Sequence, residues 1–263
     1  MVHHRYIRCG KSKVLDDIFV TFICMKVKLT PAYLLGFFAL VFLIHEIHDW
    51  AHFILSATYC GCLGNRAFDS WTVCNTCVTS GSALALAIMA GPMVNYIIIW
   101  SGWAMMHPEN TPEKQSMGFS MVFAALPFPR IMGALAGGGD ETWALRQLFQ
   151  RANGSNHYFV AAAGLLIVLA LCLPALIRIF ILVTGWVQRA LLLPAFLVLP
   201  GLADHWLVSG ELNRLLAGGL FARQLLRGGT QLFVFVWLVV VLGLYLLSRK
   251  SLENVLEYKE LSV

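Results

Sequence analysis

Six long apolar runs constrain the fold of this chain more than any other feature of its sequence. They cover roughly residues 31–59, 82–106, 118–136, 158–181, 190–208 and 232–247. A helix needs about 20 predominantly apolar residues to cross the hydrocarbon core of a bilayer. With 59% hydrophobic and only 13% charged residues, the chain is too apolar for a soluble domain. We therefore expect an all-α fold, a polytopic membrane helical bundle of about six transmembrane spans, some broken by proline or glycine.

Charge and length set the organisation around these runs. We expect a basic segment at residues 1–30, one membrane bundle at 31–249 and a tail at 250–263. The apolar stretch 18–25 is too short for a span and predicts a strand or an interfacial segment. Basic residues at both ends favour a cytoplasmic N-terminus, although the arginines between the third and fourth runs fit this orientation poorly. The net charge of +5 requires no nucleic-acid partner. For the location, we expect a multi-pass protein of a bacterial-type inner (plasma) membrane.

The first run contains five ionisable residues within eight positions, in the segment Ile44-His45-Glu46-Ile47-His48-Asp49-Trp50-Ala51-His52. Such groups are costly in lipid unless they face a cavity, a partner or a metal. At about 100° per residue, four of the side chains share one helix face: His45, His48, Asp49 and His52. Because His48 and His52 are one helical turn apart, both imidazoles reach a single ion. The pattern predicts a metal site, with a proton relay or a structural polar cluster as the alternative.

A cysteine-rich loop at residues 60–77 follows the first run. Its four cysteines, in the pattern C-x-C…C-x-x-C, are Cys60, Cys62, Cys74 and Cys77. They predict a structural zinc in a reducing compartment or two disulfides in an oxidising one. If the N-terminus is cytoplasmic, the loop lies outside, which favours disulfides.

Proline interrupts the second run in the segment Gly91-Pro92-Met93-Val94-Asn95. A proline within a membrane helix frees a backbone carbonyl and bends the axis. Asn95 adds an amide that needs partners when it is buried. The segment predicts either a packing kink, with Asn95 bonded between helices, or part of a functional site.

The third run is broken twice, by Leu126-Pro127-Phe128-Pro129 and by Gly137-Gly138-Gly139. Irregular backbone at membrane depth is tolerated only where it is buried in protein or lines a cavity. Asp140 follows the glycines directly, either as the N-cap of a helix over 141–151 or as a ligand. The polar group Asp204-His205-Trp206, near the end of the fifth run, predicts an interface feature rather than a ligand.

The order of these elements resembles the site-2 protease family of intramembrane zinc metalloproteases. Its members carry H-E-x-x-H on one helix, a Gly-Pro-x-x-Asn-like element on the next, and a later proline-containing segment that ends in an Asp ligand. The matching segments fall roughly within residues 40–145, in an expected core of 30–145: His48-Asp49-Trp50-Ala51-His52, Gly91-Pro92-Met93-Val94-Asn95, and Leu126-Pro127-Phe128-Pro129 followed by Asp140. The chain departs from the family in having Asp49 for Glu, Leu126 before the proline and Glu141 where glycine is usual.

The resemblance implies a Zn²⁺ ion held by His48, His52 and Asp140. A second register, His45-Glu46-x-x-Asp49, keeps the glutamate but replaces a histidine by aspartate, and it makes His45 a further candidate ligand. We prefer the first register because catalytic zinc sites often combine two imidazoles with one carboxylate.

The resemblance also implies an activity, the hydrolysis of a peptide bond in a transmembrane protein or peptide substrate within the lipid bilayer. Asp49 takes the place of the general base that activates water, with Glu46 as the other candidate. Asn95, with Gly91 and Pro92, takes the place of the element that binds the unwound substrate.

Two other classes of membrane protein compete with this interpretation. The first is a non-catalytic metal-binding protein, or a proton or metal transporter that uses the histidines as relay groups. Acids scattered over several helices would favour a transporter, whereas here they are concentrated on one helix and at Asp140. A di-iron oxygenase ranks last, because such enzymes need several histidine-rich segments and this chain has one.

Overall fold

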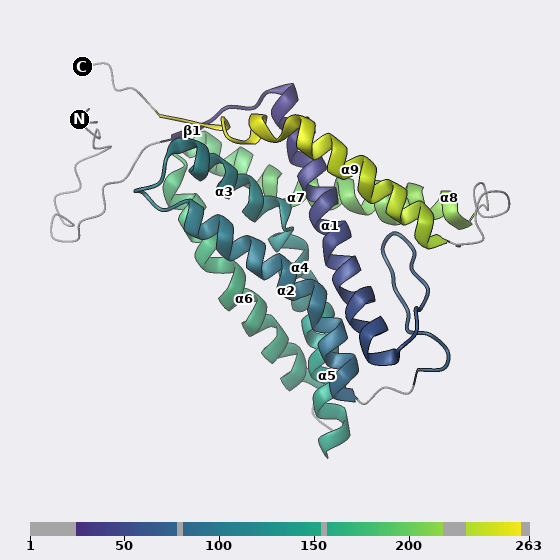
Figure 1. Cartoon of the computed structure of the whole chain (residues 1–263). Helices are drawn as coiled ribbons and strands as arrows, with labels where there is room; N and C mark the ends of the chain where they lie inside the picture. The colour runs from purple at the N-terminus through teal and green to yellow at the C-terminus, as the bar shows by residue number, and fades with distance from the viewer. Residues whose placement is uncertain (1–24, 78–80, 154–156, 218–229, 259–263) are drawn as a thin grey trace, which may run out of the picture.

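The computed structural model describes residues 25–77, 81–153, 157–217 and 230–258. Over these residues the chain is an all-α bundle, as the apolar runs predict, and six helical segments are long and apolar enough to cross a membrane (Figure 1). The third segment starts earlier and the fifth ends later than its apolar run, because polar residues continue both helices.

Short strands precede the first span and follow the last. In chain order the elements are β1 (Met25–Val27), α1 (Pro31–Cys60), α2 (Gly81–Met105), α3 (Pro112–Ala124), α4 (Pro127–Leu135), α5 (Asp140–Asn153), α6 (His157–Leu182), a π-helix (Gln188–Leu192), α7 (Leu193–Asp204), a second π-helix (His205–Leu212), α8 (Asn213–Ala217), α9 (Thr230–Leu252) and β2 (Leu256–Tyr258). Helices α3 and α4 together make the third span, and the segment from the first π-helix to α8 makes the fifth.

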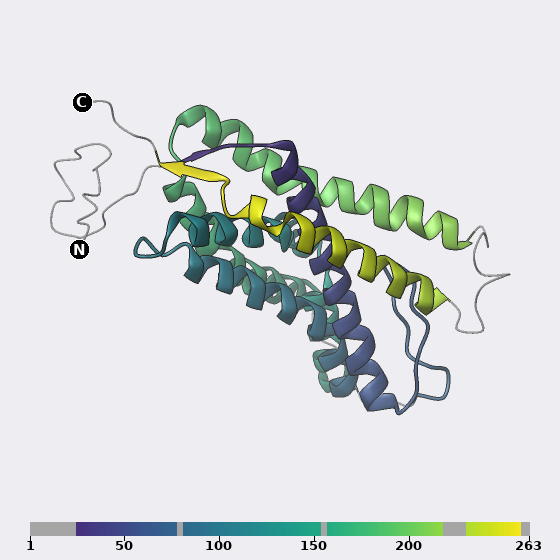
Figure 2. The same cartoon turned by 45° about the horizontal axis from the view of Figure 1, so that its top comes forward.

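Helix α1 lies at the centre of the bundle and packs against both α2 and α9 (Figures 1 and 2). Thr30 caps its start, since the Thr30 Oγ1 accepts the amide hydrogen of Tyr33 at 3.1 Å. Pro31 fits the first turn, where a missing N–H leaves no bond unmade. The helix ends at Gly61, whose φ of 66° lies in the left-handed region that favours glycine.

The third span is broken where the sequence predicts it. Leu126 separates α3 from α4 and has a φ of 54°. Pro127 disfavours right-handed helical backbone at the preceding residue, and the left-handed conformation strains a leucine. After α4, Gly137 and Gly139 adopt φ values of 74° and 83°, which a side chain would hinder. This glycine turn starts α5 at Asp140, one residue earlier than expected.

The segments before the first span and after the last lie side by side. Strands β1 and β2 pair antiparallel, with Met25 opposite Tyr258. Both segments therefore lie at the same end of the bundle, as an even number of spans requires (Figure 1). Helix α9 continues to Leu252, so the segment predicted as a tail starts with helix and strand. The predicted apolar stretch 18–25 lies outside the described residues except for Met25.

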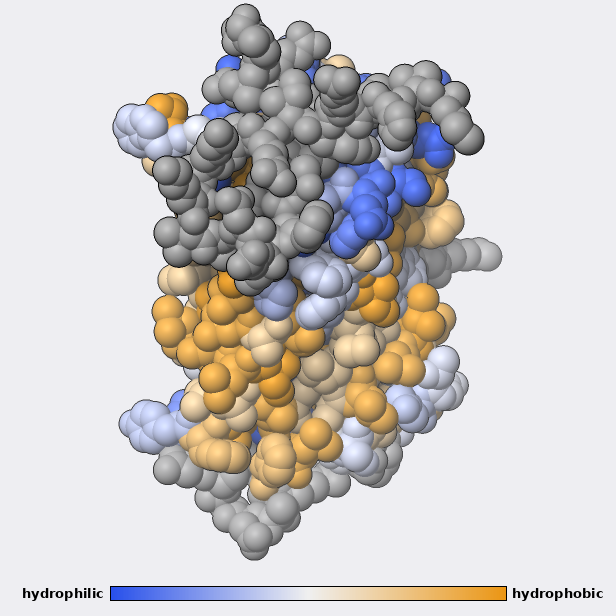
Figure 3. All heavy atoms as spheres, turned by 90° about the vertical axis from the view of Figure 1, so that its left-hand side faces the viewer, coloured by the Kyte–Doolittle hydropathy of each residue, from blue (hydrophilic) through white to orange (hydrophobic). Residues whose placement is uncertain are grey.

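On the face shown in Figure 3, apolar side chains cover the middle of the molecule and hydrophilic side chains lie toward its two ends. Leu166 and Ile177 of α6 belong to the exposed apolar surface. Inside the bundle, the Phe196 ring of α7 contacts the rings of Phe119 and Phe123 at 5.2 and 5.3 Å between centroids. An apolar exterior around a packed interior is the arrangement that a multi-pass membrane protein needs.

Candidate metal centre

Three side chains from two helices meet at one point. His48 and His52 lie one turn apart on α1, and the glycine turn brings Asp140, at the start of α5, beside them. The Nε2 atoms of the imidazoles are 3.1 Å apart, and the Asp140 Oδ2 lies 3.4 Å from Nε2 of His48 and 3.7 Å from Nε2 of His52. These ligand atoms are close enough together to hold one metal ion.

The orientation of His52 is fixed by its other ring nitrogen. The His52 Nδ1 lies 2.8 Å from the carbonyl oxygen of Ala87. Because a carbonyl oxygen is only an acceptor, Nδ1 must carry the ring hydrogen and donate it. The Nε2 of the neutral ring therefore keeps its lone pair, directed toward His48. Metal-binding histidines commonly make this bond through the nitrogen that does not bind the metal. Trp71 stacks on the same ring, with centroids 5.2 Å apart.

Helix α2 approaches both histidines at Gly91. A Cβ atom there would lie 2.5 Å from Cε1 of His48 and would overlap Nε2 of His52, so only glycine fits. Gly91 and the following Pro92 are not among the described residues that line the cavity beside the histidines. The structure thus places Gly91 against the imidazoles, whereas the resemblance assigns it to substrate binding.

Asn95 lies one turn further along α2 and lines the cavity. The Asn95 Nδ2 donates to the carbonyl oxygen of Ala125 at 3.0 Å and so holds the break before α4. The Asn95 Oδ1 is buried and has no hydrogen-bond partner among the described residues. A buried amide oxygen of this kind can accept a hydrogen bond from a bound molecule.

Arg130, on α4, lies between the histidines and a buried acid. One of its terminal nitrogens is 2.9 Å from Nδ1 of His48, and the other donates to Oε1 of Glu141 at 3.0 Å. The hydroxyl of Tyr96 donates to the same oxygen at 2.5 Å. Glu141 is 1% exposed, so this acid is neutralised inside the protein and not by solvent.

Asp140 is held in its anionic form. Burial alone raises the pKa of its carboxyl, but the hydrogen bond and charge of His48 and the positive charge of Arg130 outweigh burial. The pKa of Asp140 therefore lies well below its usual range. An ionised carboxylate at this point is the form that binds a cation.

His45, expected as a further ligand, belongs to a neighbouring polar cluster. The His45 Nδ1 lies 2.8 Å from Oδ2 of Asp204, and its Nε2 lies 3.6 Å from Oδ2 of Asp49. Asp204 is only 7% exposed, so the prediction of an interface feature is wrong for this residue, while the adjacent His205 is exposed. Asp204 points into the protein, where it pairs with the imidazole of His45 on α1.

The two candidate bases lie in different places. Glu46 is fully buried, and its Oε2 accepts from Arg66 at 2.8 Å, away from the residues that line the cavity. Asp49 lines the cavity, with Oδ1 3.9 Å from Nε2 of His48. Its Oδ2 lies 3.6 Å from Arg66. By position, Asp49 is the acid that faces the metal centre, and Glu46 is the counter-ion of Arg66.

The cavity beside the centre has a volume of about 380 Å³, and carboxylates gather around it. Apart from the exposed Asp69, five carboxylates lie in it or directly behind it: Glu46, Asp49, Asp140, Glu141 and Asp204. In the described chain two guanidinium groups pair with them, those of Arg66 and Arg130. His45 lies between Asp49 and Asp204 as a third basic partner, so a cation would bind at Asp140, beside His48 and His52.

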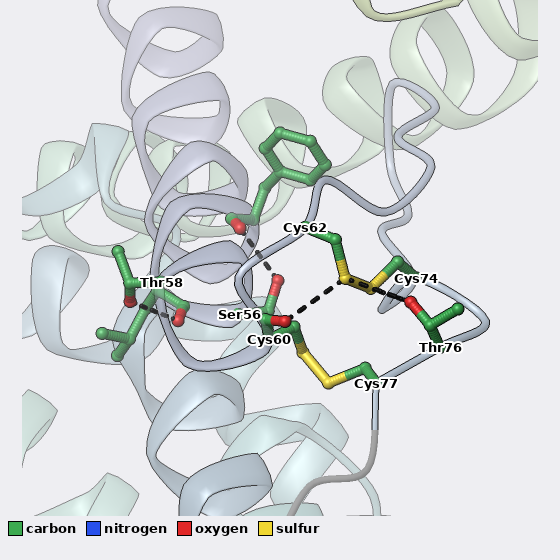
Figure 4. The surroundings of a disulfide bond; sticks show 9 residues. Ser56, Thr58, Cys60, Cys62, Cys74, Thr76 and Cys77 are labelled. Carbon is green, nitrogen blue, oxygen red and sulfur yellow. Dashed lines mark hydrogen bonds between the residues drawn. A yellow bond between two sulfur atoms is a disulfide. The ribbon is translucent and has the colours of Figure 1, made fainter.

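The cysteine-rich loop forms one wall of the cavity. The four cysteines are drawn together as two disulfides, Cys60–Cys77 and Cys62–Cys74, one of the two arrangements that the sequence left open (Figure 4). Phe68, at the far end of the loop, packs against Val208 and Val234. The loop therefore returns toward α9 beside α1 (Figure 1). Trp71 of this loop stacks on the His52 ring.

Several of these partners were not predicted from the sequence. Arg66, Trp71 and Arg130 were left without a role, and Tyr96 was not considered. A signal was present for Arg130, since an arginine beside prolines inside an apolar run needs a buried counter-ion. No comparable signal marked Trp71, because its contact with His52 depends on the path of the loop.

The donor set fits a zinc ion. Two imidazoles and one carboxylate are a common ligand set of catalytic zinc, which keeps a fourth position for water or substrate. All three candidate ligands line the cavity, together with Asp49 and Asn95. No family model matches the chain, and no curated protein or solved structure matches it. The chemistry of the centre therefore rests on its geometry.

Proposed function

We propose that this chain is a zinc-dependent intramembrane peptidase that hydrolyses peptide bonds of membrane-embedded protein or peptide substrates. The observation that carries the proposal is the meeting of His48, His52 and Asp140 beside a cavity within the membrane-spanning bundle. The carboxylates gathered around the cavity and the hydrogen bond that orients His52 support a metal there.

Each residue has a role that follows from its position. A bound Zn²⁺ lowers the pKa of a coordinated water to about 7 and polarises a carbonyl group. Asp49 faces the same space and would accept a proton from water there. Asn95 presents its unpaired Oδ1 to a backbone N–H of the substrate. A substrate helix must unwind locally to offer that N–H, since a helical N–H is already bonded.

The experiment measures metal and cleavage separately on full-length protein purified in detergent. Metal analysis should find about one zinc per chain. His48→Ala and Asp140→Asn should each lower zinc content sharply. Asp49→Asn should keep the zinc and abolish cleavage of a transmembrane test peptide. Full zinc occupancy in both His48→Ala and Asp140→Asn would exclude this centre.

One observation favours a non-catalytic metal-binding protein as the second candidate. Asp49 is held by His45 and lies 3.6 Å from Arg66, and both contacts draw its carboxylate away from a general-base role. A protein of this class would bind zinc through the same residues and leave every test peptide intact. Zinc binding without cleavage in the wild type therefore selects it.

A further inference from the structure

The guanidinium group of Arg130 occupies the edge of the candidate metal centre. Its nitrogens lie 2.9 Å from Nδ1 and 3.4 Å from Nε2 of His48, and 3.8 Å from Oδ2 of Asp140. The side chain is only 11% exposed, so solvent screens its charge little. Two of the three candidate ligands thus already have a cation beside them.

Arg130 and a metal make opposite demands on His48. A guanidinium N–H that donates to Nδ1 requires a lone pair there. A neutral imidazole that binds a metal through Nε2 carries its hydrogen on Nδ1. Zinc about 2.0–2.1 Å from Nε2 would also lie within roughly 5.5 Å of an arginine nitrogen, where two cations repel.

The guanidinium has a second partner at the same time. Glu141, which follows Asp140 on α5, accepts from Arg130 at 3.0 Å. The Tyr96 hydroxyl bonds to the same oxygen and holds the carboxylate in place. Arg130 can therefore give up His48 and keep a buried counter-ion.

We propose that Arg130 is an internal competitor for the metal: its guanidinium contacts His48, Asp140 and Glu141 when the metal is absent, and it releases His48 and Asp140 and keeps Glu141 when the metal enters. This inference rests on the proposed metal centre. With Arg130 present, the three ligands should bind the metal more weakly and exchange it faster than they would without Arg130. Arg130 acts here as a positioning residue, through His48 and Asp140.

The test is the affinity of the full-length protein in detergent for Zn²⁺, by chelator competition, and for Co²⁺, by its visible absorption. Arg130→Gln should bind both metals about tenfold or more tightly, because a competing charge is removed. Arg130→Lys, which keeps the charge, should stay close to the wild type. The matched control is Arg178→Gln. Arg178 donates to the carbonyl oxygen of Met106, away from the candidate ligands, and its removal should leave the affinity unchanged.

Glu141→Gln should change the metal affinity in the opposite direction. It removes the alternative counter-ion, so Arg130 stays on His48 and Asp140 and both metals bind more weakly. In the Arg130→Gln background most of this effect should disappear. The double variant thus separates competition from a general loss of negative charge.

If the wild type binds metal and Arg130→Gln binds it equally well or more weakly, the proposed competition is refuted. The proposed metal centre is not affected by that result. A gain shared by Arg130→Lys also refutes the competition, since the charge would not be the cause. If neither the wild type nor any variant binds metal, the proposed function fails and the competition fails with it. Should Arg130→Gln not fold, Arg130→Met repeats the test with an uncharged side chain of similar length.

Discussion

Replacing Gly91 by alanine perturbs the candidate metal centre without removing any ligand. The added Cβ would lie 2.5 Å from Cε1 and 2.6 Å from Nδ1 of His48 and would overlap Nε2 of His52, whereas ordinary contacts start at 3.4 Å. Each ring must therefore move by about 1 Å or α2 must withdraw, and overpacking of this kind costs about 1–3 kcal/mol. Metal sites tolerate changes of only about 0.2 Å in ligand distance.

We expect Gly91→Ala to weaken zinc affinity about tenfold or more, which corresponds to about 1.4 kcal/mol. Chelator competition measures the affinity, and thermal unfolding in detergent measures the cost of overpacking. Gly243→Ala is the matched control, because a Cβ at Gly243, also within a long membrane helix, meets nothing within 4 Å. Wild-type zinc affinity in Gly91→Ala would refute the placement of α2 against the imidazoles.

Three further predictions follow from buried contacts. Arg66→Met should lower stability by about 3–5 kcal/mol, since it leaves Glu46 buried without its partner, and adding Glu46→Gln should restore most of the melting temperature in detergent. Peptide mapping under non-reducing conditions should recover the pairs Cys60–Cys77 and Cys62–Cys74. Serine replacement of either pair should cost about 2–4 kcal/mol, and four freely alkylated thiols in the native protein would contradict both pairs. Asn95→Ala should keep zinc content unchanged and reduce cleavage of a transmembrane peptide, and loss of zinc from this variant would point to a structural role instead.

The sequence predicted those parts of the site that depend on local geometry. The spacing of His48 and His52 fixes their separation on any helix, because 3.6 residues make one turn. The glycines before Asp140 predicted a break, because backbone with positive φ needs glycine, and the turn lies there. The apolar runs likewise predicted the spans, because lipid requires every backbone group to be bonded within a helix.

Only the tertiary structure decided which partners these residues have. Glu46 and Asp49 are three residues apart, yet one pairs with Arg66 behind the cavity and the other faces His48. Asp204 lies far along the chain and turns inward because His45 is opposite it. Such pairs join elements that are distant in sequence. They are set by how helices and loop pack, which the periodicity of one segment does not encode.

The sequence by itself therefore determined a membrane-spanning helical bundle, the helix that carries the histidines and the places where the chain breaks. The tertiary structure decided that Arg130 contacts His48, that Trp71 covers His52 and that Gly91 sets the distance of α2. The physical reason is the range of each interaction. Hydrophobic periodicity and backbone φ preferences act within one segment, whereas charges and rings are paired only after separate segments meet.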